Sequence, residues 1–309
     1  MSTPGNPYRR QLQLLVQVLP FVANEKCFGL KGGTAINLFF RDLPRYSVDI
    51  DLTYVPGDGY PTAMKAIGAA LQRIADRLSS GSPSFHVALG QGEPEGPVDT
   101  LTVADADTEV KVEVNPVLRG TVHPVIEMEA TATVQREFGF VAARVLSRPD
   151  VYAGKLVAAL DRQHPRDLFD VKLLLENEGI SDTLFRTFLA YLVGHKGSIP
   201  DVLAPRRKDI RRLYEEQFVP MTVERASFEE LLETRERLIH EVLARLDEPL
   251  KQFLLSVQSR KPEWALLGLD GVKRLPAVKW RLVNLGKMSE AALAREITRL
   301  EDVLEGGAR

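Results

Sequence analysis

Two aspartates separated by a single isoleucine lie in residues 48–52, where apolar and acidic side chains alternate without interruption. This alternation predicts a half-buried β-strand, because strand side chains point to opposite faces with a period of two. The apolar residues then face a core, while Asp49 and Asp51 share the other face. Two carboxylates this close repel one another, and a divalent cation removes the repulsion. Hard oxygen ligands favour Mg²⁺ or Mn²⁺.

A glycine turn precedes this strand. Gly32, Gly33 and Thr34 follow an apolar strand expected at residues 27–30 and open an apolar helix expected at residues 34–43. Glycines let the backbone approach a ligand closely, and the amides at a helix start favour anions. A nucleotide phosphate is one occupant of such a turn, although no Walker loop is present. Taken alone, the turn is also an ordinary strand–helix connection.

A third carboxylate lies on a later strand, expected at residues 109–114. Valines alternate there with polar residues, and Glu113 is on the polar side. If this strand lies beside residues 48–52, Glu113 projects to the same face as the two aspartates. Three convergent carboxylates can hold two metal ions for in-line phosphoryl or nucleotidyl transfer. The alternative is an amphipathic strand with a solvated acid.

These motifs together resemble the DNA polymerase β-type nucleotidyltransferase superfamily. More closely, GGTAINLFF followed by RYSVDIDL resembles the AbiEii/AbiGii nucleotidyltransferase toxins, a family that includes the MenT toxins. The resemblance covers roughly residues 26–178. In the second half it includes Lys155 in GKLVAAL and the run RDLFD that begins at Arg166, which match the family's lysine and R/K-D-x-x-D motifs.

The resemblance implies an active site drawn from both halves of the chain. The metal ligands are Asp49, Asp51 and Glu113. The catalytic set is Asp49, Asp51, Lys155, Asp167 and Asp170, with the choice between Asp167 and Asp170 open. The nucleotide and phosphate set is Gly32, Gly33, Thr34, Arg45, Ser47 and Arg166, of which Arg45 and Ser47 support the turn before the metal-binding strand. Without the resemblance, a surface lysine is the favoured interpretation of Lys155, and capping acids at a helix start are the favoured interpretation of the two later aspartates.

The fold class expected is α+β. Residues 1–148 form a polymerase β-type nucleotidyltransferase domain, a mixed sheet flanked by helices, and residues 149–309 form a mostly helical domain. The remaining strands are expected at residues 85–89, 100–104 and 139–145. The helices are expected at residues 8–23, 61–78, 150–162, 166–178, 182–195, 206–218, 226–258 and 288–305.

Charge and composition limit the function classes. Forty basic and 42 acidic side chains give a net charge of −2, so the chain as a whole is not a basic nucleic-acid binder. Residues 251–287 nevertheless concentrate eight basic and two acidic side chains, and residues 206–212 form a second basic cluster. Either cluster is an RNA-binding face or a solvated helix face. Cys27 is the single cysteine, which excludes a cysteine-rich zinc site and fits a cytoplasmic protein. No segment has the length of a membrane span.

The resemblance implies a toxin that transfers nucleotides from a nucleoside triphosphate to RNA, most plausibly the tRNA 3′ end, and so blocks translation. It also implies a cognate antitoxin encoded nearby, usually a winged-helix repressor. One alternative acceptor is a hydroxyl of a protein or small molecule. Another alternative is an inactive fold that serves as a regulatory binding module, against which the intact set of three carboxylates argues.

Overall fold

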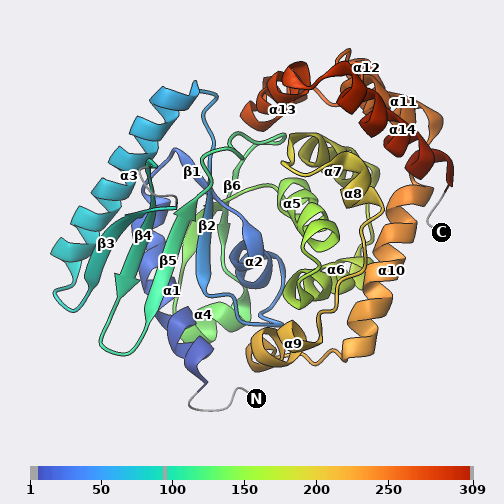
Figure 1. Cartoon of the computed structure of the whole chain (residues 1–309). Helices are drawn as coiled ribbons and strands as arrows, with labels where there is room; N and C mark the ends of the chain where they lie inside the picture. The colour runs from blue at the N-terminus through green and yellow to red at the C-terminus, as the bar shows by residue number, and fades with distance from the viewer. Residues whose placement is uncertain (1–5, 93–95, 307–309) are drawn as a thin grey trace. The chain divides into compact units, whose positions relative to one another are not determined.

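The computed structural model describes residues 6–92 and 96–306 and divides into two compact units. The first unit comprises Met1–Val151 and Val219–Arg225, and the second comprises Tyr152–Phe218 and Ala226–Arg309. Figure 1 shows the chain coloured from the N-terminus to the C-terminus. Residues 219–225, although they follow much of the second unit in the sequence, therefore belong to the first unit.

A seven-stranded mixed sheet forms the centre of the first unit, as far as the described residues show, in the order β3-β4-β5-β2-β1-β7-β6. The strands are β1 (Phe28–Leu30), β2 (Asp49–Tyr54), β3 (His86–Gln91), β4 (Val98–Ala104), β5 (Glu109–Val114), β6 (Ile126–Glu129) and β7 (Ala142–Val145). Strand β2 pairs in parallel with β5 and antiparallel with β1. Six of these strands match the expected ones. The exception, β6, is an edge strand of four residues with mostly exposed side chains. Its sequence IEME does alternate apolar and acidic residues, but the alternation is short and was missed.

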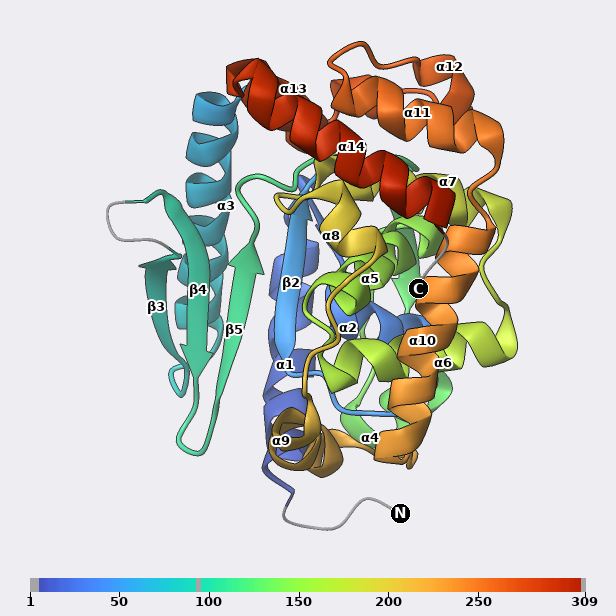
Figure 2. The same ribbon diagram turned by 45° about the vertical axis from the view of Figure 1, so that its right-hand side comes forward.

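Two helices cover one face of the sheet (Figure 2). They are α1 (Pro7–Ala23), whose buried leucines and valines pack on β7, β5 and β2, and α3 (Tyr60–Gly81), which packs on β3 and β4. The side chain of Asn6 caps α1 by accepting from the Tyr8 amide. Val48, Ile50 and Leu52 are buried, which confirms the expected apolar side of β2.

The helix after the glycine turn has two parts. One α-helical turn, α2 (Gly32–Ala35), continues as a π-helix, η1 (Ile36–Phe40). It ends earlier than residue 43, because Arg41 is extended and Leu43 has a positive φ of 61°. The first unit also contains α4 (Ala132–Phe138) and a 3₁₀ turn, η3 (Val219–Met221).

The second unit is helical in its described part. Helix α5 (Arg148–Asp161) begins in the first unit and continues into the second. The others are α6 (Pro165–Asn177), α7 (Asp182–Gly194), α8 (Ile199–Leu203), α9 (Arg211–Leu213), the π-helix η2 (Tyr214–Phe218), α10 (Phe228–Ala244), α11 (Glu248–Gln258), α12 (Trp264–Leu267), the 3₁₀ turn η4 (Val272–Arg274), α13 (Pro276–Lys287) and α14 (Glu290–Gly306).

Two of the helices expected from the sequence, at residues 226–258 and 206–218, have different bounds in the structure. The stretch 226–258 is two helices, because Asp247 caps α11 through the Leu250 amide and Pro249 has no N–H with which to continue α10. Helical structure in 206–218 begins only at Arg211, so the expectation that Arg206 opens a helix is wrong. None of the helices in the described ranges has the length and apolar character that crossing a membrane requires. The expected α+β class, with a sheet domain before a helical region, is confirmed.

Candidate active site

The register of β2 and β5 brings three carboxylates to one side of the sheet. Asp49 lies opposite Lys111, and Asp51 lies opposite Glu113, on these parallel strands. Their apolar neighbours Ile50 and Val112 are fully buried between them. Because strand side chains alternate, Asp49, Asp51 and Glu113 all point away from the α1 side. Asp49 is exposed, whereas Asp51 and Glu113 are half-buried. The sequence-based expectation that the two strands are neighbours is therefore met.

The glycine turn lies directly against Asp51. Gly32 has a φ of +71°, and a Cβ built at Gly32 would overlap Oδ2 of Asp51. The Lys31 amide also donates to the Asp51 carbonyl at 2.9 Å. A side chain at residue 32 would therefore be strained in its backbone and would displace the carboxylate, which explains the glycine.

Three polar side chains around the turn form a buried group. The Thr34 hydroxyl donates to the Asp49 carbonyl at 2.6 Å and lies 3.0 Å from the Ser47 hydroxyl. A Cβ at Gly33 would come within 2.7 Å of both Arg45 Nη2 and Ser47 Oγ. Thr34, Arg45 and Ser47 are each at most 7% exposed. These side chains therefore fix the loop before β2 against the turn, and the Thr34 hydroxyl is engaged with the backbone.

A distant segment supports the same loop. The Tyr46 amide donates to the Met221 carbonyl at 2.7 Å, and Arg45 forms a β-bridge with Thr222. The amides of Val223 and Glu224 both donate to the Pro44 carbonyl. Residues 219–225 thus hold the entry to β2. Sequence patterns do not reveal this role, because the segment has neither helical nor strand periodicity.

Lys111 adds a cation to the carboxylate face. Its ammonium lies 2.5 Å from Glu113 Oε1. The hydrogen bond to Glu113, and then the charges of Glu113 and Asp49, raise the pKa of Lys111 against the opposing effect of burial. The alternation in EVKVEVN already places Lys111 and Glu113 on one face, so period two was a sufficient signal for this neighbour.

The carboxylate face has the chemistry of a divalent metal site, but its three acids do not converge closely enough to form a ready one. Asp49, Asp51 and Glu113 supply the hard oxygen ligands that Mg²⁺ and Mn²⁺ prefer. Across residues 6–92 and 96–306, however, no three His, Cys, Asp or Glu side chains lie close enough together to form a ready metal site. Glu113 is paired with Lys111. For all three acids to bind metal, Glu113 has to exchange its ammonium partner for the metal.

The second unit contains a separate buried ionic cluster. The Lys155 ammonium lies 2.7 Å from Asp167 Oδ1 and 2.9 Å from Asp170 Oδ2. Lys155 on α5 is 6% exposed, and both aspartates on α6 are fully buried. The spacing of three residues places both acids on one helix face, as expected. Lys155 is therefore neither a surface lysine nor an unpaired cation.

Arg162 completes this cluster. It donates from Nε and Nη2 to the two oxygens of Asp167, at 2.5 and 3.0 Å. Burial by itself would raise the pKa of Asp167, but Lys155 and Arg162 overcome that effect and hold the pKa well below its usual range. Arg162 lies in the turn between α5 and α6, at the last position of the helix expected at residues 150–162. No motif in the sequence marks it, so its role was missed.

Arg166 lies at the start of the same helix. Its amide donates to Nδ1 of His164, which caps α6 and lies 3.1 Å from Gln217 through Nε2. Burial lowers the pKa of His164 despite the contact with Gln217. Arg166 thus lies on the first turn of α6, the helix that also bears Asp167 and Asp170. The role that the structure shows for His164 is to cap this helix.

Several arginines of the two basic clusters are already engaged in ion pairs or hydrogen bonds within the protein. In the first, Arg207 pairs with Glu236 at 2.7 Å and Arg212 with Glu216 at 3.0 Å. In the second, Arg281 is 8% exposed and donates to the Gly197 carbonyl at 2.9 Å. The expectation that all of 251–287 forms an RNA-binding face is too broad, because Arg260 also donates to backbone carbonyls, those of Leu285 and Met288.

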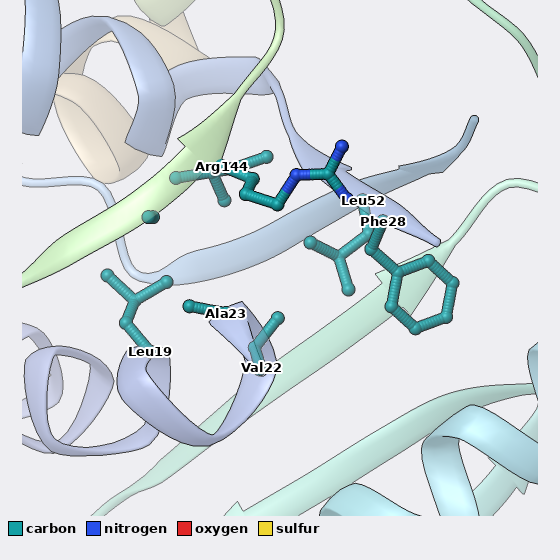
Figure 3. Close-up of a pocket in the computed structure, with 8 residues that line it drawn as sticks. Leu19, Val22, Ala23, Phe28, Leu52 and Arg144 are labelled. Atoms are coloured by element: carbon teal, nitrogen blue, oxygen red, sulfur yellow. The ribbon is translucent and has the colours of Figure 1, made fainter. Parts of the chain in front are cut away.

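A small apolar pocket lies under the sheet on the α1 side (Figure 3). Its volume of about 10 Å³ has room for about one water molecule. The pocket is lined by Leu19, Val22, Ala23, Phe28, Leu30, Leu52, Ala143 and Arg144. None of the three carboxylates lines it, so it is a packing defect on the side of the sheet away from them.

Comparison with known proteins identifies the family. Residues 13–266 match the model of the family described as the nucleotidyl transferase AbiEii toxin of a type IV toxin–antitoxin system. A solved structure, the MenT4 nucleotidyltransferase toxin of Mycobacterium tuberculosis H37Rv, has a similar fold, with a TM-score of 0.60 and 14% identity over 90% of this chain and 93% of that chain. The comparison with curated proteins gave no match. The family match spans most of the chain and confirms the resemblance seen in the sequence: this protein belongs to the AbiEii family of nucleotidyltransferase toxins.

Proposed function

We propose that this toxin transfers nucleotides from a nucleoside triphosphate to the 3′ end of an RNA, most plausibly tRNA, and thereby blocks translation. The observation that carries the proposal is the shared register of Asp49, Asp51 and Glu113 on β2 and β5, with the Gly32 turn against Asp51. This arrangement combines a hard-oxygen face with a turn whose first amides have no acceptor within the helix.

The first unit binds the triphosphate in this proposal. The amides of Gly32 and Gly33 receive phosphate oxygens, and the backbone can approach because neither residue has a side chain. Arg45 and Ser47 keep the turn and β2 together, and Thr34 ties the turn to the Asp49 carbonyl. Asp49, Asp51 and Glu113 would hold Mg²⁺ or Mn²⁺, which activates the attacking hydroxyl and neutralises the leaving pyrophosphate when bound.

The second unit contributes Lys155, Asp167 and Asp170 as one preorganised group. The ammonium is balanced by two buried carboxylates, so its first role is to fix those acids. Contact between Lys155 and a triphosphate would require the ammonium to leave one of them. Arg166, on the first turn of α6, is the phosphate-binding cation of this group, and one of the two aspartates acts near the acceptor hydroxyl.

An RNA acceptor fits the uneven charge of the second unit. Six cations of residues 251–287 have no ion-pair partner in the part of the chain that the structure describes: Lys251, Lys261, Lys273, Arg274, Lys279 and Lys287. A polyanion would neutralise them and release its counterions. The toxin acts in the cytoplasm in this proposal, together with an antitoxin of the winged-helix repressor type encoded nearby.

The test is incubation with total tRNA, Mg²⁺ and each labelled nucleoside triphosphate in turn, followed by sequencing of the RNA 3′ ends. We expect one or more nucleotides added at the terminal hydroxyl, with release of pyrophosphate. Oxidation of the terminal ribose by periodate removes the acceptor and should abolish labelling. If labelling persists on oxidised RNA, or moves to protein, the acceptor is a different hydroxyl, as in the alternative of protein or small-molecule modification.

A further inference from the structure

One face of α13 combines exposed cations with an exposed tryptophan. Lys279, Trp280, Val283 and Lys287 fall on one side of the helix by their spacing. Trp280 is 42% and Val283 is 56% exposed. The opposite side, made of Ala277, Val278, Arg281 and Leu285, is buried. The exposed side of α13 therefore places two apolar side chains next to two cations.

The charge on this face is uncompensated. Residues 271–289 contain no acidic side chain. Lys273 and Arg274, on η4 immediately before α13, are exposed as well. Within the described residues, none of these cations has an ion-pair partner, in contrast to Arg207 and Arg212 of the first basic cluster. The face formed by Lys273, Arg274, Lys279, Trp280, Val283 and Lys287 is called the α13 face below.

We propose that the α13 face binds an unpaired stretch of the RNA acceptor, with a base stacked on Trp280 and phosphates on the surrounding cations. Aromatic rings set among cations bind single strands in this way, because every base offers a π-face. The proposal rests on the proposed function for the identity of the polyanion. It adds a binding site on a named helix and a preference for single-stranded over paired RNA.

Two other kinds of binding partner, an acidic protein and an anionic membrane, fit the observations less well. A stable protein partner needs an interface of about 1,000 Å² with an apolar centre, and the α13 face offers only Trp280 and Val283. A membrane surface would need the apolar side of the helix for insertion. That side is packed within the second unit, where Arg281 donates to the Gly197 carbonyl.

Intrinsic fluorescence gives a direct test, because the chain has two tryptophans. Trp264 packs beside Phe253 with ring centroids 5.9 Å apart, and Trp264→Phe leaves Trp280 as the sole reporter. Titration with a single-stranded oligoribonucleotide should quench this fluorescence, and a duplex of equal length should quench it far less. Vesicles of anionic lipid and poly-glutamate serve as the other two arms. Quenching by either of these at least as strong as by single-stranded RNA would overturn the proposal.

Substitutions extend the test to affinity. Trp280→Ala should weaken binding of the oligoribonucleotide by about 5- to 100-fold, the loss expected for one stacked base, and Trp280→Phe should restore most of it. Replacing both Lys279 and Lys287 by glutamine should weaken binding and flatten its salt dependence. Lys65→Gln, at an exposed lysine of α3, is the matched control and should change neither quantity. Thermal denaturation verifies that each variant is folded.

Nucleotide transfer separates failure of this inference from failure of the proposed function. Under the proposal, Trp280→Ala raises KM for RNA and leaves KM for the triphosphate unchanged. If the parent extends RNA and Trp280→Ala binds and extends it equally well, the α13 face is not the site, while the proposed function stands. If the parent extends no RNA at all, the proposed function fails, and binding of single strands at Trp280 is then judged from the fluorescence titration alone.

Discussion

Asp51 lies directly opposite Glu113 on the parallel strands β2 and β5, with the Gly32 turn against the Asp51 carboxylate. This pairing connects two acids that are 62 positions apart in the sequence. Asp49, two residues before Asp51, completes the face.

Asp49→Asn and Asp51→Asn should each lower nucleotide transfer by about 100-fold or more, a loss typical of removing one electrostatic group from an active site. Neither carboxylate is in the core, so the fold should survive, and loss of repulsion should keep or raise stability without metal. The measurements are transfer rate and melting temperature with and without Mg²⁺. Asp107→Asn, an exposed control whose partner Arg10 is also exposed, should match the parent. Wild-type transfer by either site variant would contradict the metal-binding role.

Gly32→Ala should reduce transfer and the shift in melting temperature on adding Mg²⁺. The new Cβ would overlap Asp51 and occupy a left-handed backbone conformation. Strain of this kind costs about 1 kcal/mol or more. Gly57→Ala is the matched control, since nothing lies within 4 Å of a Cβ at that position. Equal behaviour of the two variants would show that the close approach of Gly32 has no functional consequence.

Lys155→Met should destabilise the protein by about 3–5 kcal/mol, because it leaves two buried carboxylates without their shared cation. The sequence places Lys155 in the catalytic set, and the buried contacts add a structural role to that prediction. Urea denaturation measures the effect. The double variant Lys155→Met with Asp170→Asn should recover part of the loss, because one buried charge is removed. A stability equal to the parent's would mean that the cluster is open to water.

Stability should depend on pH through Asp167. Its folded pKa lies below the unfolded value of about 3.9, so ionisation of Asp167 stabilises the fold above that pH and this contribution is lost as pH falls further. Asp167→Asn lacks the contribution at every pH. The difference in melting temperature between parent and variant should therefore be largest near neutral pH and shrink below about pH 4. A constant difference down to pH 3 would contradict the lowered pKa.

Arg281→Met and Lys279→Met test two neighbours that sequence cannot distinguish. Arg281 is 8% exposed and its guanidinium satisfies the Gly197 carbonyl, so its loss should cost about 1–3 kcal/mol of stability. Lys279 is exposed, and its loss should change stability little. Thermal denaturation of both variants gives the comparison. Equal stabilities would remove the distinction between structural and surface cations in this cluster.

The short-range features of this protein follow from local patterns. The alternation around Asp49 and Asp51 predicts β2 and its buried side, and the Gly-Gly-Thr turn predicts a strand–helix connection. Spacing of three residues places Asp167 and Asp170 on one face of a helix. The combination of these motifs was specific enough to indicate the AbiEii family. Each motif by itself depends on residues within a few positions of one another, for which backbone geometry sets the outcome.

Tertiary structure decided the partners of these residues, because partners distant in sequence are chosen by packing. Only the fold shows that Lys155 is shared by two buried acids, that Arg162 joins them, and that residues 219–225 hold the loop before β2. In the same way, Trp280 and Arg281 are consecutive residues of α13, yet Trp280 is exposed and Arg281 is buried. Which face of a helix is buried depends on what packs against it. Composition could therefore count the cations of residues 251–287 but could not say which of them are exposed.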